Sequence, residues 1–280
     1  MMASYCVRQV EQGIWQITDV LDDRAYVVVG KHAALLVDTT IGCGDLREVV
    51  NSITSLPLTV ALTHNHYDHT GGMGWFDEVL INRLEMPLLE REQSRGSRVH
   101  DRMLQNGKIE PDEPFAFRDG AAPKVHVLEE GDVFDLGGVT AEAVLLPGHT
   151  AGSMGFLVRE CGVLLSGDAV TPIMCLFFEE SLSIDVYRAT LAKMAGLPFE
   201  RFYTGHHDVG LGKSTLASFD ACAEFALTAR GVPWRHTMLP ELVGTAYLAP
   251  CDTLDADSPD FRALIGPYVP RSSRRKRDGI

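Results

Sequence analysis

The sequence predicts an α/β fold in which two β-sheets pack face to face and helices cover their outer sides. Short runs rich in β-branched and aromatic residues occur in two separate parts of the chain, and segments of helical spacing accompany each set. Within each part the strands follow one another in series. Strict alternation with helices is absent, which argues against a doubly wound parallel sheet.

The first part contains three strands in succession, which are predicted at 13–19, 25–30 and 33–38. A helix is predicted at 45–53, because its apolar residues fall on one face. The run 58–63 is almost entirely apolar, as expected for a strand in the middle of a covered sheet, and it leads directly into His64.

An excursion at 83–114 separates the two parts. It is charged and carries Met and Leu at helical intervals, so one or two helices are predicted there. These helices form either a cap over a site or a hairpin on the surface.

The second part contains five strands, which are predicted at 125–128, 140–145, 154–158, 163–166 and 201–204. Helices are predicted at 184–194 and 216–229. One main domain is therefore expected over 1–231. Weak periodicity at 232–270 predicts an irregular C-terminal extension. The tail 271–280 holds five basic residues and one aspartate, and we expect a disordered, solvated end rather than a tether to nucleic acid or membrane.

The composition limits the class of protein. The 280 residues are 45% hydrophobic and 22% charged, with a net charge of −13, which counts against a protein that wraps nucleic acid. No apolar run is long enough to span a membrane, and residues 1–10 lack an apolar stretch of signal-peptide type, so a cytoplasmic protein is expected. The six cysteines form no CxxC pair and are expected to be free thiols. A small-molecule substrate and a homodimer are the expected partners.

The most informative segment is THNHYDHTGG at 63–72. It places four side chains that can bind metal within six positions directly after an apolar strand: His64, His66, Asp68 and His69. Clustered imidazoles would be costly to bury without a metal or protons to satisfy them. One metal ion would not need all four side chains, whereas two ions would. The sequence therefore predicts a metal site here.

Three further strand ends carry a residue that can bind metal. His149 follows the predicted strand at 140–145, Asp168 follows the one at 163–166, and His206 follows the one at 201–204. Strand-end loops in layered β folds gather at one edge and build sites. His207 adjoins His206, and both are candidates for this ligand.

The ordered set HxHxDH, His, Asp, His resembles the metallo-β-lactamase-fold hydrolase superfamily, over about residues 12–210. This resemblance implies a four-layered αββα sandwich of two mixed sheets with a two-metal site at their edges. It implies that His64, His66 and His149 hold one ion, that Asp68, His69 and His206 hold the other, and that Asp168 bridges them. His206 is preferred to His207 because it directly follows the glycine. Zinc is the expected metal, with iron or manganese as alternatives. Asp38 resembles a strand-end aspartate of the family that supports a ligand, and a strand-terminating cap is the alternative.

The resemblance also implies a binuclear hydrolase that uses a metal-bridging hydroxide, with Asp68 handling the proton. The presence of Asp168 disfavours penicillin hydrolysis, and His66 disfavours the oxygen-reducing di-iron members. The ligand pattern is that of glyoxalase II and lactonase relatives, although no glutathione-binding set follows His206. A thioester, lactone or ester is the expected substrate. Its pocket could be lined by residues 173–178, for which a segment of ordinary core is the favoured interpretation.

Three alternatives stay open at this point. The same site could serve a phosphodiesterase or nuclease, or an iron-dependent oxidoreductase of the sulfur dioxygenase type. A binding module with a structural metal is the third, and the absence of cysteine ligands argues against it.

Overall fold

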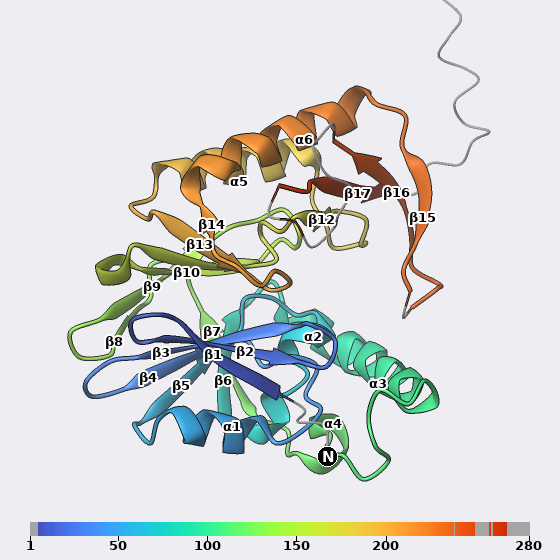
Figure 1. Cartoon of the computed structure of the whole chain (residues 1–280). Helices are drawn as coiled ribbons and strands as arrows, with labels where there is room; N and C mark the ends of the chain where they lie inside the picture. The colour runs from blue at the N-terminus through green and yellow to red at the C-terminus, as the bar shows by residue number, and fades with distance from the viewer. Residues whose placement is uncertain (1–4, 238, 250–257, 259, 268–280) are drawn as a thin grey trace, which may run out of the picture.

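Two β-sheets face each other in the computed structural model, which describes residues 5–237, 239–249, 258 and 260–267 (Figure 1). Helices cover the outer side of each sheet, so the architecture is the predicted four-layered αββα sandwich. Among the described residues, none of the helices is both long and apolar enough to cross a membrane.

The first sheet has seven strands in sequence order: β1 (Tyr5–Glu11), β2 (Ile14–Asp19), β3 (Arg24–Val29), β4 (Ala34–Val37), β5 (Leu58–Ala61), β6 (Glu78–Asn82) and β7 (Lys124–Leu128). Strands β1 to β4 are antiparallel, whereas β4 to β7 are parallel. The change to parallel pairing matters for function, because the carboxyl ends of β4 and β5 then lie at the same edge of the sheet.

The second sheet has six strands in the spatial order β14 (Leu211–Gly212), β13 (Arg201–Thr204), β11 (Val163–Gly167), β10 (Met154–Val158), β9 (Thr140–Leu145) and β8 (Val133–Asp135). Strands β11 and β13 are parallel, so their carboxyl ends also meet at one edge.

The main core lies between the two sheets, and alternation along the strands builds it. On β3, Tyr26 and Val28 face the second sheet, whereas Ala25 and Val27 face the helical layer on the other side. Phe156 of β10 is fully buried in the same central cluster.

The helices follow local sequence signals. On the first sheet lies α1 (Leu46–Ile53), which begins where the Asp45 side chain accepts a hydrogen bond from the Glu48 amide. On the second sheet lie α5 (Ile184–Gly196) and α6 (Leu216–Thr228). The remaining helices are α2 (Tyr67–Thr70), α3 (Leu89–Gln105) and α4 (Ala116–Asp119), with short 3-10 turns η1 (Met73–Trp75), η2 (Met86–Leu88), η3 (Arg159–Cys161) and η4 (Lys213–Thr215).

The prediction of an irregular extension after residue 231 is wrong for the part of it that the structure describes. A third sheet forms there, in the order β12 (Ile173–Cys175), β17 (Ala263–Pro267), β16 (Val243–Leu248) and β15 (Val232–Arg235). Since β12 pairs in parallel with β17, the sheet crosses the boundary predicted at 231. The predicted disordered tail at 271–280 lies outside the described residues.

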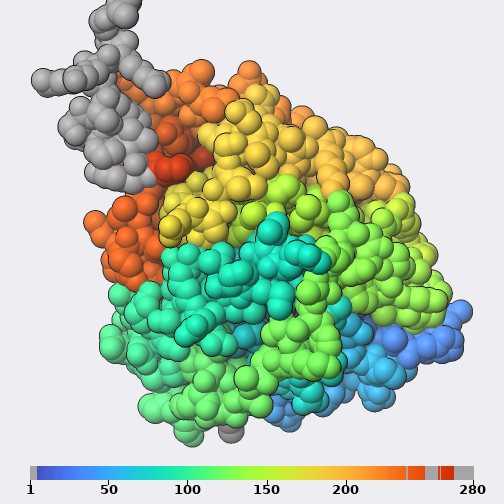
Figure 2. Space-filling view, turned by 180° about the vertical axis from the view of Figure 1, so that it is seen from behind, coloured from blue at the N-terminus to red at the C-terminus, as the bar shows by residue number. Residues whose placement is uncertain are grey.

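The excursion at 83–114 contains α3 as its main helix. Figure 2 shows this segment, in teal and green, on the surface beside the yellow segment that follows β11. Its inner face is buried, with Val99 and Met103 packed against Tyr67 and Phe115. The helix thus lies on the surface, as expected for a surface hairpin, and it also borders the site, as expected for a cap. Each of these two predictions describes part of its position.

Candidate metal centre

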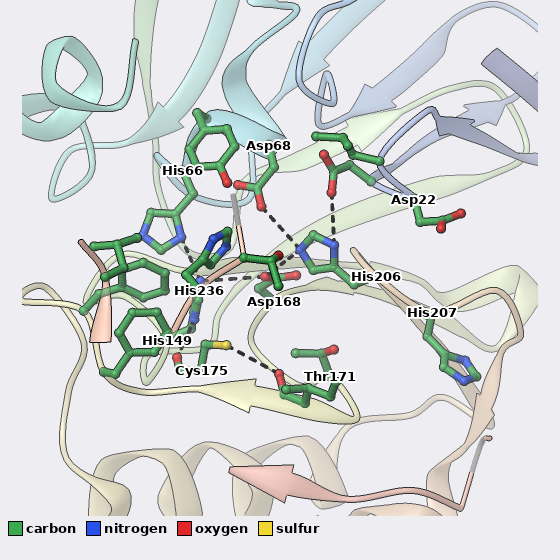
Figure 3. A pocket seen from close by; sticks show the side chains of 18 of the residues that line it. Asp22, His66, Asp68, His149, Asp168, Thr171, Cys175, His206, His207 and His236 are labelled. Carbon is green, nitrogen blue, oxygen red and sulfur yellow. Dashed lines mark hydrogen bonds and ion pairs between the residues drawn. The ribbon is translucent and has the colours of Figure 1, made fainter. Parts of the chain in front are cut away.

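Four loops that follow strands converge at one edge of the sandwich (Figure 3). The loop after β5 carries the cluster that begins at His64, and the loops after β9, β11 and β13 carry His149, Asp168 and His206. This convergence follows from the topology, because the strands that precede these loops end at the same edge of their sheets.

The structure brings all seven sequence-predicted residues together. Their ligand atoms form three groups in which the atoms lie within 4.8 Å of one another: His64, His66 and His149; His64, His69 and Asp168; and Asp68, His69 and His206. His207 lies apart from them in Figure 3, with its Nδ1 3.2 Å from the carbonyl oxygen of Val209. Of the two adjacent candidates, only His206 reaches the centre.

Buried atoms without hydrogen-bond partners show that the cluster suits metal ions. They are His64 Nε2, His69 Nε2, Asp68 Oδ1 and Asp168 Oδ1. Buried polar atoms are normally paired, so four such atoms in one cluster call for a common partner. Imidazole nitrogens and carboxylate oxygens are ligands that Zn²⁺ accepts.

Two histidines of the first group, His64 and His149, favour the neutral form. Burial and the neighbouring imidazoles lower the pKa of His64 well below its usual value and lower the pKa of His149 to about 4. His149 Nδ1 donates to the carbonyl oxygen of Cys175 at 2.7 Å, which leaves Nε2 as a lone-pair donor. That Nε2 lies 2.9 Å from His66 Nδ1, so the two nitrogens point into the same space.

Asp38 supports His69 by contacting its imidazole ring. Its carboxylate accepts hydrogen bonds from the Thr63 amide at 2.7 Å and the Thr63 hydroxyl at 2.8 Å, and it lies 2.7 Å from His69 Nδ1. Burial lowers the pKa of His69, but Asp38 and Asp168 outweigh it and raise that pKa well above its usual value. Asp38 therefore orients a predicted ligand, which is the first of the two sequence interpretations.

Two aspartates before β3 support His206. Asp23 Oδ1 lies 3.3 Å from His206 Nδ1, on the side of the ring that faces away from Asp168. Asp19 orders this loop by accepting hydrogen bonds from the amides of Leu21 and Asp23. A carboxylate on the remote nitrogen fixes both the tautomer and the orientation of an imidazole ligand.

Glu180 holds His66 in the same way and ties it to α3. Its Oε1 accepts from His66 Nε2 at 3.1 Å and from the guanidinium of Arg91, and Arg95 Nη1 lies 3.6 Å away. Both arginines also bind Glu92, which is 1% exposed. Burial raises the pKa of Glu180, but the hydrogen bond to His66 and the charge of Arg91 lower it to about 2. The proton on His66 Nε2 leaves Nδ1 free to bind a metal.

Replacing Glu180 by glutamine should weaken metal binding by about 10- to 100-fold, because such supporting carboxylates contribute that much to metal affinity. The measurement is competition with a chromogenic chelator. Glu179→Gln is the matched control, since the Glu179 side chain is 93% exposed and its Oε2 lies 4.0 Å from Arg91 Nη1. Equal affinities for Glu180→Gln and the control would show that Glu180 does not support the site.

A cavity of about 620 Å³ opens onto the centre. Carboxylates, histidines, apolar side chains and aromatic rings line it, and α3 contributes Glu92. Two roles were considered from the sequence for residues 173–178, the lining of a pocket and ordinary core, and the segment contains residues of both kinds. Ile173, Cys175, Phe177 and Phe178 line the cavity, whereas Met174 and Leu176 are buried in the core.

Apart from Asp38, sequence reasoning missed the residues that support the candidate ligands. Glu180 and Asp23 act through contacts between elements far apart in the chain, and no spacing marks them. Thr63 contacts the adjacent His64, with its Oγ1 3.0 Å from His64 Nδ1. Only the position of Thr63 directly before the cluster offers a local signal. Trp234, which lines the cavity from the third sheet, belongs to a segment in which no strand was predicted.

The family model described as the metallo-beta-lactamase superfamily matches residues 19–206. Among curated proteins, the chain is 30% identical over 160 residues to "Acyl-coenzyme A thioesterase MBLAC2" of Gallus gallus, covering 52% of this chain and 56% of that protein. It is 32% identical over 161 residues to "Thioesterase pkgB" of Emericella nidulans, covering 57% of this chain and 37% of that protein.

Among solved structures, a metallo-beta-lactamase from Pontibacter korlensis superposes with a TM-score of 0.57 at 18% identity, covering 79% of this chain and 99% of that one. This likeness concerns the fold alone. The matches to the thioesterases span little more than half of the first of them and less of the second.

Proposed function

The chain belongs to the metallo-beta-lactamase superfamily, and we propose that it is a metal-dependent hydrolase of a small carbonyl substrate, a thioester before a lactone or an ester. The observation that carries the proposal is the set of seven convergent His and Asp ligands with buried, unpartnered donor atoms. The names of the two thioesterase relatives favour the thioester within this class.

The proposed centre is binuclear. His64, His66 and His149 would hold one divalent ion, Asp68, His69 and His206 would hold the other, and Asp168 would contact both. Zinc fits this donor set of imidazoles and carboxylates. Bound there, the two ions would lower the pKa of a water molecule toward neutrality and polarise the substrate carbonyl.

Asp68 is the residue that would take the proton from the attacking water. Burial raises its pKa, but His69, His206 and His66 outweigh that effect and lower it, so the carboxylate is ionised and can accept a proton. Its Oδ1 is buried without a partner, and Oδ2 lies 3.6 Å from His206 Nε2. In thioester hydrolysis the water oxygen bonds to the carbonyl carbon, the C–S bond breaks, and Asp68 can return the proton to the departing thiolate.

The charge of the cavity favours this class over a phosphodiester. Five carboxylates line it, namely Asp22, Asp23, Asp68, Glu92 and Asp168, against one lysine, Lys108. A substrate with a phosphate backbone requires Lys and Arg side chains for binding. A neutral carbonyl compound has no such requirement.

The test is a comparison of initial rates in the zinc-loaded protein on a simple thioester, a lactone, an ester and an aryl phosphodiester. We expect the thioester to be cleaved fastest, and Asp68→Asn to lower that rate by about 10²- to 10⁴-fold, the usual contribution of a positioned acid or base. Asp22→Asn is the control, because Asp22 lines the same cavity but its side chain is 85% exposed. Release of no acid from any carbonyl substrate, or faster cleavage of the phosphodiester, would reject the proposal.

A further inference from the structure

Three aromatic side chains form a continuous surface from the metal centre to the third sheet, here called the aromatic wall: Phe177, Phe178 and Trp234. The ring of Phe178 lies 4.4 Å from that of His66, measured between centroids. The rings of Phe177 and Phe178 are stacked at 4.1 Å with an interplanar angle of 29°, and Trp234 follows at 4.9 Å from Phe177. All three side chains line the cavity.

Core packing does not account for the aromatic wall. Met174 and Leu176 on the same segment are each only 2% exposed, whereas Phe177, Phe178 and Trp234 are half-buried and keep ring surface open to the cavity. Aromatic surface left in water is unfavourable, and a ligand that covers it gains that free energy. The wall therefore has the character of a binding surface.

The side of the cavity away from the aromatic wall carries acidic side chains. Asp23 and Asp68 flank His206 there, and Val20 and Leu21 are apolar residues that also line the cavity. A substrate with one apolar group and one polar group can then bind in only one orientation. The apolar group would then face the aromatic wall, and because Phe178 lies beside His66, the group that the wall covers would lie next to the reacting carbonyl.

Trp234 reaches the site through the sheet that follows the family-matched region. The match ends at residue 206, and Trp234 lies on β15, which pairs with β16 at Gly244. The third sheet is anchored to the main domain through the parallel pairing of β12 with β17. The third sheet thus adds to the cavity wall a residue that lies outside the family-matched part of the chain.

We propose that the aromatic wall binds a flat aromatic acyl group, so that the substrates of this protein are thioesters of aromatic acids; this inference rests on the proposed function. The ring of Trp234 is tilted by 55° against that of Phe177, so a planar ligand can stack on one ring and meet another edge-on. Stacking contributes beyond the burial of area alone. A saturated ring of the same size would gain only the burial.

The test uses two thioesters of one thiol, N-acetylcysteamine, carrying a benzoyl or a cyclohexanecarbonyl group. The two acyl groups match in size and differ in planarity. The readout is the change in the ratio of their kcat/KM values upon mutation, in which their different intrinsic reactivities cancel. We expect Trp234→Leu to lower kcat/KM for the benzoyl thioester by about three- to tenfold, and for the cyclohexanecarbonyl thioester by less than about twofold.

Two further variants separate recognition from folding. Trp234→Phe keeps an aromatic face and should restore most of the ratio. Leu248→Ala alters the third sheet at a side chain that is 44% exposed and does not line the cavity, and it should leave the ratio unchanged. An unchanged ratio in Trp234→Leu, or an equal loss for both substrates, would overturn the proposal.

The aromatic wall can also be tested if the proposed thioesterase function is wrong. If neither thioester is cleaved, binding of 2-naphthoate to the zinc-loaded protein, measured by calorimetry, still tests the aromatic wall. Binding that weakens in Trp234→Leu and recovers in Trp234→Phe would support the wall as an aromatic subsite. Binding that is insensitive to position 234 would overturn it.

Discussion

Replacing Asp168 by asparagine is expected to lower thioester turnover by at least about a thousandfold, which corresponds to about 4 kcal/mol of transition-state stabilisation. Asp168 is the side chain that contacts both halves of the centre. Its Oδ2 lies 3.0 Å from His206 Nε2 and 3.7 Å from His149 Nε2, and its Oδ1 lies 3.5 Å from His69 Nε2. Asparagine keeps the shape and removes the charge that two metal ions would share.

The measurement for Asp168→Asn combines initial rates with metal content and circular dichroism. Asp220→Asn is a suitable control, because Asp220 pairs with Arg188 at the surface between α5 and α6. A fold that is intact, with turnover within tenfold of the wild type, would show that the centre does not depend on this carboxylate.

Replacing Gly205 by alanine is expected to lower turnover by at least about a hundredfold, because misplacement of reacting groups by about 1 Å has that effect. A Cβ at this position would lie 2.4 Å from Asp168 Oδ1 and 2.5 Å from His69 Cε1. The backbone of Gly205 does not have a positive φ, so alanine is conformationally acceptable there. The effect is therefore steric, and it falls directly on two of the seven candidate ligands.

Gly212→Ala is the matched control for this change. A Cβ at Gly212 would meet nothing closer than Ser214 Oγ at 3.7 Å, and its φ of −69° suits alanine. Metal affinity and initial rates should fall together in Gly205→Ala and stay at the wild-type level in Gly212→Ala. Wild-type rates in both variants would mean that Asp168 and His69 can move without consequence.

Much of the architecture around the site was predictable because its strands are strongly patterned. The strand predicted at 201–204 is found at those residues, and the helix predicted at 45–53 is found at 46–53. The cluster that begins at His64 was recognisable because four metal-binding side chains follow one buried strand. Strand-end position then indicated His149, Asp168 and His206, and the structure brings them to the same place.

Two of the strands that were not predicted, β1 and β15, lack this patterning. β1 is mostly exposed and its polar residues do not alternate with apolar ones, and β15 contains Pro233. Their strand conformation depends on tertiary pairing, β1 with β2 and β15 with β16, which local propensity does not reveal. The same reason applies to Glu180 and Trp234, whose roles depend on contacts with α3 and with Phe177.

The central claim is that the seven convergent ligands hold two divalent ions. The most direct measurement is the metal content per chain after reconstitution with zinc and removal of free metal, by elemental analysis of the wild type and of Asp168→Asn. Two zinc ions per wild-type chain and fewer than two in Asp168→Asn are the predicted result. One ion or none in the wild type, or two ions in both proteins, would contradict the proposed binuclear centre.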